Sequence, residues 1–407
     1  MTSSVASMRR ELSNGPAALV AVDAALSTVV ITPVVVTYWR ITWKLMDVYL
    51  LPGRKAWSTA ASVAIGFLGL FVFTFFQHRL KWYLKPRKHT AMYYVISRLY
   101  TAAFAYSCIN SWRGVWDAMD MLTGTRPSVV ATSVALGICS LAFMKTLRNI
   151  VAPPIAILTD SYDGYFEVPT LFRIGIRDGT GSWLYVLDSF FSVCIIGSLV
   201  VIVWRGVWNL MDQYLYPKDM NTTAILSLVI GYSVVLTAFA LQPFVKKLVN
   251  KVSGLKRILA VDVYLLFSFF GAVNVWRGVW IMLDEHFIPD APITSYWVSH
   301  IACFGFLVLL NSSNSILVRG VYIDAEEDGT QCVDFPCYYV RLLVQKRKQR
   351  KQKRVKEEEE EEEEGKEMMP VKVEVNENFE KILITGENGS ITMLNEMKET
   401  LNSAKIV

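Results

Sequence analysis

The sequence WRGVWNLMD at 204–212 is one of four copies of a pattern in which a tryptophan and an arginine precede a second tryptophan and an aspartate. The other copies are WRITWKLMD at 39–47, WRGVWDAMD at 112–120 and WRGVWIMLD at 276–284. The interval from the first copy to the third is almost the same as the interval from the second to the fourth. This spacing indicates a duplicated half that carries two copies.

Each copy lies in a long apolar segment. The 407-residue chain is 53% hydrophobic with a mean hydropathy of +0.34, and its apolar residues occur in blocks. A helix that crosses a membrane needs about 20 apolar residues. We therefore predict an all-α membrane protein with eight transmembrane helices, at 24–50, 57–77, 94–122, 127–147, 184–214, 223–243, 258–286 and 295–317. Two passes per copy predict four parallel helix-hairpin repeats.

The connections between these helices predict the domains and the orientation. Asp163-Gly164 and Asp328-Gly329 precede strand-like residues, which predicts two small cytoplasmic β-hairpins. Lys and Arg concentrate in the second, fourth and sixth connections, so both termini should be cytoplasmic in the plasma membrane. The expected parts are an N-terminus (1–23), a first four-helix half (24–147), a hairpin insert (148–183), a second half (184–318), a second hairpin (319–345) and a charged cytoplasmic tail (346–407).

The repeated pattern places four side chains on one helix face. At 100° per residue, both tryptophans, the arginine and the aspartate of a copy fall within about 100° of one another. The arginine and aspartate are about 10 Å apart along the axis, so a partner on a neighbouring copy is more plausible than one on the same helix. The candidate residues are Trp39, Arg40, Trp43, Asp47, Trp112, Arg113, Trp116, Asp120, Trp204, Arg205, Trp208, Asp212, Trp276, Arg277, Trp280 and Asp284.

Two interpretations of this repeat motif stay open at this point. The arginines and aspartates can form interhelical clasps that hold the hairpins together, since a charge in a membrane is costly without a partner. They can also line an outer vestibule that binds an anion, a lipid headgroup or a partner peptide.

A second set of charges lies about four helical turns before each first tryptophan. Its members are Asp23, Arg98, Asp188 and Asp262. They predict an inner charged ring, with Arg98 available for a buried ion pair. These residues either reach toward water at the membrane interface or form an inner gate or ion site.

The tail carries a basic run, KRKQRKQKRVK at 346–356, followed by eight glutamates. Basic residues close to a membrane attract the anionic inner leaflet. Candidate lipid-binding residues are Lys346, Arg347, Lys348, Arg350, Lys351, Lys353 and Arg354. The alternative is a solvated charged segment.

Motifs of enzymes are not found in the sequence. There is no phosphate-binding loop, no HExxH, no GxSxG and no dinucleotide fingerprint. The four histidines and six cysteines form no recognisable ligand pattern. We therefore expect no enzymatic activity, no catalytic residues, no cofactor, no metal and no nucleic-acid partner.

The four copies of the motif, the eight passes and the charged tail resemble the fuseless family of invertebrate multi-pass membrane proteins, over roughly 25–340. The first copy departs from the pattern at Ile41, Thr42 and Lys44. The resemblance implies a neuronal protein that organises presynaptic terminals and the placement of voltage-gated calcium channels. A calcium channel is then a candidate membrane-protein partner, and a homo-oligomer is possible. The alternative function is a transporter or channel with an Arg/Asp-lined outer vestibule between the repeats.

Overall fold

The computed structural model describes residues 15–84, 90–160, 164–174, 182–288, 292–326 and 331–367. The chain divides into two compact units, 1–342 and 343–407, and both predicted four-helix halves belong to the first. The described residues form helices, turns and extended loops, and none of them is in a strand.

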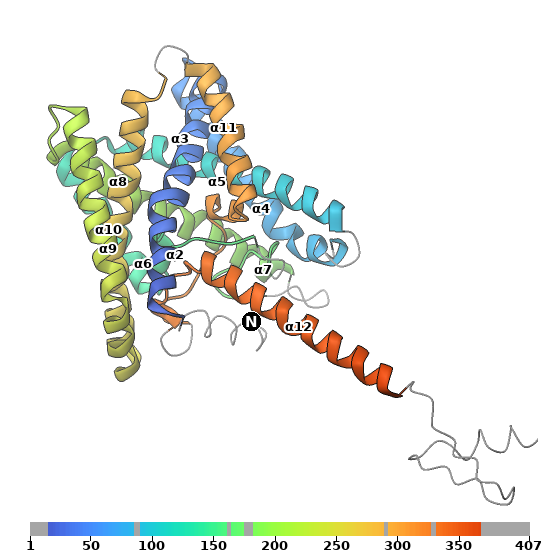
Figure 1. The fold of residues 1–407 in the computed structure, drawn as a ribbon. Coiled ribbons are helices and arrows are strands. Elements are labelled where there is room, and N and C mark those ends of the chain that lie inside the picture. The colour runs from blue at the N-terminus through green and yellow to red at the C-terminus, as the bar shows by residue number, and fades with distance from the viewer. Residues whose placement is uncertain are drawn as a thin grey trace, which may run out of the picture. The chain divides into compact units, whose positions relative to one another are not determined.

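A helix occupies each of the eight apolar segments (Figure 1). The first consists of α2 (Ala17–Leu26), a π-helical turn (Ser27–Ile31) and α3 (Thr32–Tyr49). The fifth, at the equivalent place in the second half, has the same order of elements. It consists of α7 (Ser182–Phe190), a π-helical turn (Phe191–Ile196) and α8 (Gly197–Tyr214). The others are α4 (Lys55–Tyr83), α5 (Thr90–Thr123), α6 (Pro127–Phe143), α9 (Met220–Lys251), α10 (Gly254–His286) and α11 (Pro292–Leu309).

Three short 3₁₀ turns and one long helix complete the described chain. The turns are η2 (Leu147–Ile150), η4 (Ser313–Ile316) and η5 (Gln331–Val333). The long helix is α12 (Tyr339–Glu367), whose first residues belong to the first unit and whose remainder belongs to the second.

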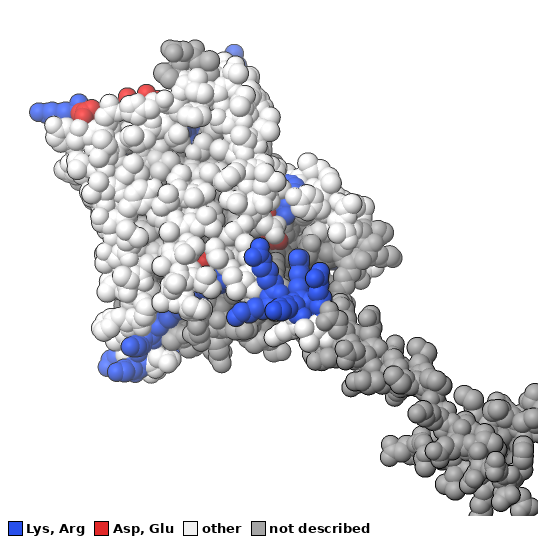
Figure 2. All heavy atoms as spheres, in the orientation of Figure 1, with Lys and Arg blue, Asp and Glu red and all other residues white. Residues whose placement is uncertain are grey.

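Six helices in the described ranges are long and apolar enough to cross a membrane. They span 17–49, 55–83, 183–214, 220–251, 254–286 and 292–309, with mean hydropathies of 1.4 to 2.4. Figure 2 shows few charged side chains over the middle of the visible helical body, and one group of Lys and Arg lies at the lower end of α9 and α10. The chain therefore fits a multi-pass membrane protein.

The helices pair differently from the predicted hairpins. The main pairs are α4 with α5, α6 with α8, α9 with α10, and α11 with α3. Each motif-bearing helix thus packs on the apolar helix that precedes it in the chain, and α11 closes the ring against α3. Glycines allow the α4–α5 and α9–α10 backbones to approach closely. A Cβ at Gly66 would lie 2.2 Å from the Ser111 nitrogen, and one at Gly231 would lie 2.5 Å from the Val275 nitrogen.

The predicted β-hairpins are not confirmed. The turn residues Asp163, Asp328 and Gly329 lie outside the described residues, and the described residues beside them form no strand. Side chains, in place of a neighbouring strand, bond the backbone of these segments. Gln77 bonds both the N–H (2.9 Å) and the C=O (3.2 Å) of Val168. Gln242, the counterpart of Gln77 in the second half, donates to the C=O of Val333 at 3.2 Å.

Two loops, 145–160 and 311–324, exchange contacts between the halves. The N–H of Asp160 donates to the C=O of Asn311, and that of Asp324 donates to the C=O of Lys145, each at 2.7 Å. The carboxylate of Asp160 accepts the backbone N–H groups that begin η4, at 3.1 and 2.7 Å. The carboxylate of Asp324 accepts those that begin η2, at 2.8 and 2.7 Å. Each half therefore caps the short helix of the other half.

Candidate functional site

The first tryptophans of the four copies form a closed ring. Their centroids are 5.2–5.6 Å apart around the ring, and neighbouring planes meet at 67–82°. Edge-to-face contacts of this kind are favourable for aromatic rings. We call this set the first tryptophan ring; it consists of Trp39, Trp112, Trp204 and Trp276.

The second tryptophans form another closed ring, one helical turn further along. Centroids of neighbours are 5.8–5.9 Å apart and their planes meet at 84–87°, so this ring is close to fourfold symmetric. This second tryptophan ring consists of Trp43, Trp116, Trp208 and Trp280. A cavity of about 220 Å³ is lined by all eight tryptophans together with Lys44 and Asp47. We call it the tryptophan cavity.

Each arginine of the motif bonds the aspartate of an adjacent copy. The arginine contacts the aspartate of the preceding copy, not the following one, and the first copy closes the ring with the fourth. The Nε–Oδ1 distances are 2.9 Å for Arg113–Asp47, 2.8 Å for Arg205–Asp120, 2.7 Å for Arg277–Asp212 and 2.9 Å for Arg40–Asp284. These four ion pairs, the clasps, link α3, α5, α8 and α10 in a circle.

The remaining guanidinium nitrogens divide the clasps into two kinds. Arg113 also donates to Ser62 (2.6 Å) and Ser58 (2.9 Å) on α4. Arg277 makes the equivalent bonds in the second half, to Ser227 and, at 3.0 Å, to Thr223 on α9.

The clasps of Arg40 and Arg205, from the first and third motif copies, lack such a hydroxyl pair among the described residues. Arg205 donates to the C=O of Gly124 at 2.7 Å, and Arg40 lies over the ring of Tyr296. The Nη1 atoms of Arg40 and Arg205 are buried and have no hydrogen-bond partner in the described part of the chain. The alternation follows the duplicated half and not a strict fourfold repeat.

The two members of a clasp differ in exposure. The arginine side chains are 0–5% exposed, whereas the aspartates are 26–46% exposed. An incoming molecule at this end of the bundle therefore meets carboxylate oxygens before it meets a guanidinium group. Of the predicted Arg/Asp-lined vestibule, Asp47 lines the tryptophan cavity, whereas the arginines lie behind the aspartates.

The opposite side of the first tryptophan ring is closed by the two loops. The indole N–H groups of Trp39 and Trp204 donate to the backbone C=O of Ile316 and Ile150, each at 2.9 Å. That of Trp276 donates to the C=O of Pro153 at 2.8 Å. Both isoleucines are almost fully buried. Loop backbone and apolar side chains thus fill the space beneath the ring.

The four residues of the predicted inner charged ring do not come together. Asp23 accepts the N–H of Val340 and bonds Arg341 Nε at 2.7 Å. Asp188 accepts three bonds from the turn at 170–174. Asp262 has a buried Oδ1 without a hydrogen-bond partner among the described residues. Asp23 and Asp188 thus bond different segments of the chain, and no hydrogen bond or ion pair joins any two of the four residues within the described ranges.

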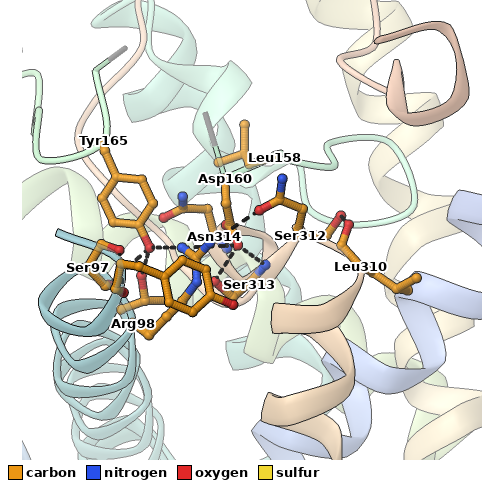
Figure 3. A network of polar contacts seen from close by, with 12 residues as sticks. Ser97, Arg98, Leu158, Asp160, Tyr165, Leu310, Ser312, Ser313 and Asn314 are labelled. Carbon is orange, nitrogen blue, oxygen red and sulfur yellow. Dashed lines mark hydrogen bonds and ion pairs between the residues drawn. The ribbon is translucent and has the colours of Figure 1, made fainter. Parts of the chain in front are cut away.

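Arg98 pairs with a residue that the sequence reasoning missed. Its Nη1 lies 3.3 Å from Asp160 and 2.8 Å from the Tyr165 hydroxyl (Figure 3). Its Nη2 lies 3.2 Å from Asn311. Asp160 therefore joins α5, η4 and the first loop. A signal was present in the sequence, since Asp160 and Asp324 are separated by the same interval as the second and fourth motif copies and precede the two Asp-Gly pairs.

Burial raises the pKa of Asp324, although the N–H groups of Leu147 and Arg148 oppose that shift. No group of three or more potential metal ligands occurs within the described residues.

The basic run lies on α12. The side chains of Arg347, Lys348, Arg350, Lys351 and Arg354 are exposed, and those of Lys346 and Lys353 lie outside the described set. The helix continues through the glutamates to Glu367.

Apolar helices of membrane-spanning length and a closed circle of clasps around paired tryptophan rings define an all-helical, multi-pass membrane protein. The chain belongs to the Fuseless family, whose sequence profile matches residues 18–317. This confirms the resemblance seen in the repeat motif, and membership points to a neuronal membrane protein. No match was found among curated proteins or among solved structures.

Proposed function

We propose that this chain is a non-enzymatic plasma-membrane protein of neurons that organises presynaptic terminals and the placement of voltage-gated calcium channels. Membership of the Fuseless family supports the neuronal setting. In this proposal the clasps and tryptophan rings hold a rigid membrane body, and other surfaces contact partner proteins and lipids.

The proposal includes eight membrane passes in four related units, with both termini cytoplasmic. Six helices in the described ranges meet the length and hydropathy of a membrane span. The other two, α5 and α6, pack along α4 and α8, which are among those six. The basic residues between α9 and α10 support the orientation, because positive residues remain on the cytoplasmic side.

One observation carries the choice of an organiser over a transporter or channel. The bundle axis beneath the first tryptophan ring holds loop backbone whose carbonyls accept tryptophan N–H groups, beside buried Ile150 and Ile316. A permeation path along this axis would require both loops to leave. Three indole N–H bonds and the reciprocal caps of Asp160 and Asp324 oppose such a movement.

The proposed contacts with lipid lie on the tail. Five exposed basic residues follow one another on α12 between 347 and 354. Each Lys or Arg near an anionic leaflet contributes about 1 kcal/mol of binding free energy. We propose that this run binds the inner leaflet and that the chain associates with a membrane protein, with a calcium channel as the candidate partner and self-association as a further possibility.

Two measurements test this function together. Purified full-length protein in liposomes is assayed for flux of chloride, potassium, calcium and protons, and we expect none above protein-free liposomes. In neurons that lack the protein, the intact chain should restore calcium-channel clusters at terminals. A variant with Arg347, Lys348, Arg350, Lys351 and Arg354 changed to glutamine should reach the cell surface and restore them less well.

Robust ion flux through the intact protein would favour the transporter alternative. Full channel clustering by a chain that never reaches the terminal would contradict the organiser. The matched control is Arg54→Gln, an exposed arginine outside the clasps, which should behave as the unaltered protein does in both assays.

A further inference from the structure

The tryptophan cavity is a concave site with an unusual wall. Eight of the chain's twelve tryptophans line about 220 Å³, together with Lys44 and Asp47. Bulk water occupies about 30 Å³ per molecule, so this space accommodates a small organic group. If the tryptophans only held the four helices together, close packing without a space of this size would be expected, because protein interiors contain few voids larger than a water molecule.

The chemistry of the wall favours positive charge. The face of an indole ring is electron-rich and attracts cations, and tryptophan does so more strongly than tyrosine or phenylalanine. Clusters of aromatic side chains bind alkylated ammonium groups in this way. The second tryptophan ring is only partly buried, so its members remain accessible from the cavity.

The charges around the mouth favour the same class of ligand. Asp47 reaches the lining of the cavity, and its side chain is 46% exposed, while its arginine partner Arg113 is 5% exposed. Anion binding would need an accessible cation that is not already paired, and all four guanidinium groups are buried behind carboxylates. The remaining cation of the lining, Lys44, is paired with Asp284 at 3.2 Å. A hard metal ion would need several oxygen ligands, and the lining supplies those of one carboxylate.

We propose that the tryptophan cavity binds a small organic cation that carries a trimethylammonium group. The alkyl surface of the group contacts the indole rings, its positive charge interacts with their faces, and the carboxylates at the mouth attract it. This binding site is independent of the organiser function, and loss of one does not imply loss of the other.

Lys44 sets a limit on this affinity. It occurs only in the first copy of the motif, where its ammonium group lies 3.2 Å from Asp284 and at the edge of the cavity. Its positive charge opposes a cationic ligand and neutralises part of the carboxylate that would attract one. Lys44→Met keeps the length of the side chain and removes the charge, so it should strengthen binding.

A trimethylammonium group has two sources in a membrane. It can come from a soluble cation such as choline or from the headgroup of a phosphocholine lipid. Competition between choline and added lipid distinguishes the two sources. Added phosphocholine lipid should weaken choline binding if the headgroup enters the cavity, whereas phosphoethanolamine lipid should not.

The test is a titration of full-length protein in maltoside micelles, which contain no choline. Choline binding is measured by calorimetry and by tryptophan fluorescence. The matched ligand is 3,3-dimethylbutan-1-ol, which has nearly the same shape and no charge. We expect choline to bind about tenfold more tightly or better, in keeping with a cation–π contribution of a desolvated site.

Substitutions inside and outside the tryptophan cavity test whether choline binds there. The double variant Trp208→Phe and Trp280→Phe should weaken choline binding about fivefold or more, because phenylalanine attracts cations less strongly. Trp82→Phe changes an exposed tryptophan on α4, outside the cavity, and should have no effect. Lys44→Met should strengthen choline binding and leave binding of the neutral alcohol unchanged.

A second preparation guards against misfolding of the phenylalanine variants. Replacement of all tryptophans by fluorotryptophan keeps the ring size and withdraws electron density from the face, so choline affinity should fall. Equal affinities for choline and the neutral alcohol would overturn the proposal, as would choline binding that survives fluorination or no binding by the folded protein at all.

Discussion

Arg277→Gln should destabilise the membrane body by about 3 kcal/mol, because it leaves one member of a clasp without its partner. Arg277 is 1% exposed and bonds Asp212 at 2.7 Å, with further bonds to Ser227 and Thr223. Removing one member of a buried ion pair costs about 3–5 kcal/mol, and the half-exposed Asp212 favours the lower end because water still reaches it. The two hydroxyls contribute little to the loss, since helix hydroxyls can bond the carbonyl four residues earlier.

Thermal unfolding in micelles measures this effect. Cys139, Cys194 and Cys303 are exposed or partly buried, so they are changed to serine in every variant tested. The buried thiols of Cys108 and Cys337 then become accessible on unfolding, and a thiol-reactive dye reports the transition. At roughly 2 °C per kcal/mol, a loss of about 3 kcal/mol lowers Tm by about 6 °C. Arg54→Gln, at an exposed site, should shift Tm by about 1 °C or less.

A double variant distinguishes the stability lost with the ion pair from the stability lost with the arginine side chain alone. Adding Asp212→Asn to Arg277→Gln removes the carboxylate that has lost its partner, so about 1 kcal/mol should be recovered. The reasoning is refuted if Arg277→Gln lowers Tm no more than Arg54→Gln does, or if the second change adds its full separate cost.

Three further predictions concern a glycine contact, a buried ion pair and the pH dependence of stability. Gly66→Ala should destabilise the protein by about 1–3 kcal/mol because its Cβ would meet the α5 backbone, whereas Gly305→Ala, with nothing within 4 Å, should be nearly neutral in the same dye assay. Lys246→Ala should cost about 3 kcal/mol, since its aspartate partner is 3% exposed, and Lys81→Ala, in the equivalent but exposed pair, should cost about 1 kcal/mol or less; equal losses would contradict this. Burial raises the pKa of Asp324, so its contribution to stability is full below about pH 3.8 and declines as pH rises through the folded-state pKa; Asp324→Asn should flatten that part of the Tm profile.

Much of the helical framework could be predicted from hydropathy and repeat spacing. Each apolar segment carries a helix, and the period of the motif places the two tryptophans on one face, where they form the two rings. The choice of helix partners was not accessible. Each internal membrane helix is followed and preceded by another along the chain, and short connections allow a hairpin with either one. The approach of the Gly66 backbone to α5, which selects one of the two, is seen only in three dimensions.

The contacts of the segments that connect the helices could not be predicted from the sequence. The strand-like residues after Asp163 suggested a hairpin, because propensity does not reveal that Gln77 and Asp188 side chains would satisfy that backbone. The inner charges were grouped by sequence spacing alone. Spacing places Arg98 at the same depth as Asp262, but only the fold shows that Asp160 from the following loop is its partner.

The circle of clasps has a consequence for the making of the protein. Arg40 leaves the ribosome before its partner Asp284, which follows 244 residues later. At about 5–20 residues per second, synthesis of that interval takes about 12–50 s. During that time Arg40 lies within an apolar helix without its partner carboxylate, and Lys44 adds a second positive charge one turn further along. A chain that stops before α10 keeps this mark of incompleteness permanently, so quality control has a chemical signal by which to recognise it.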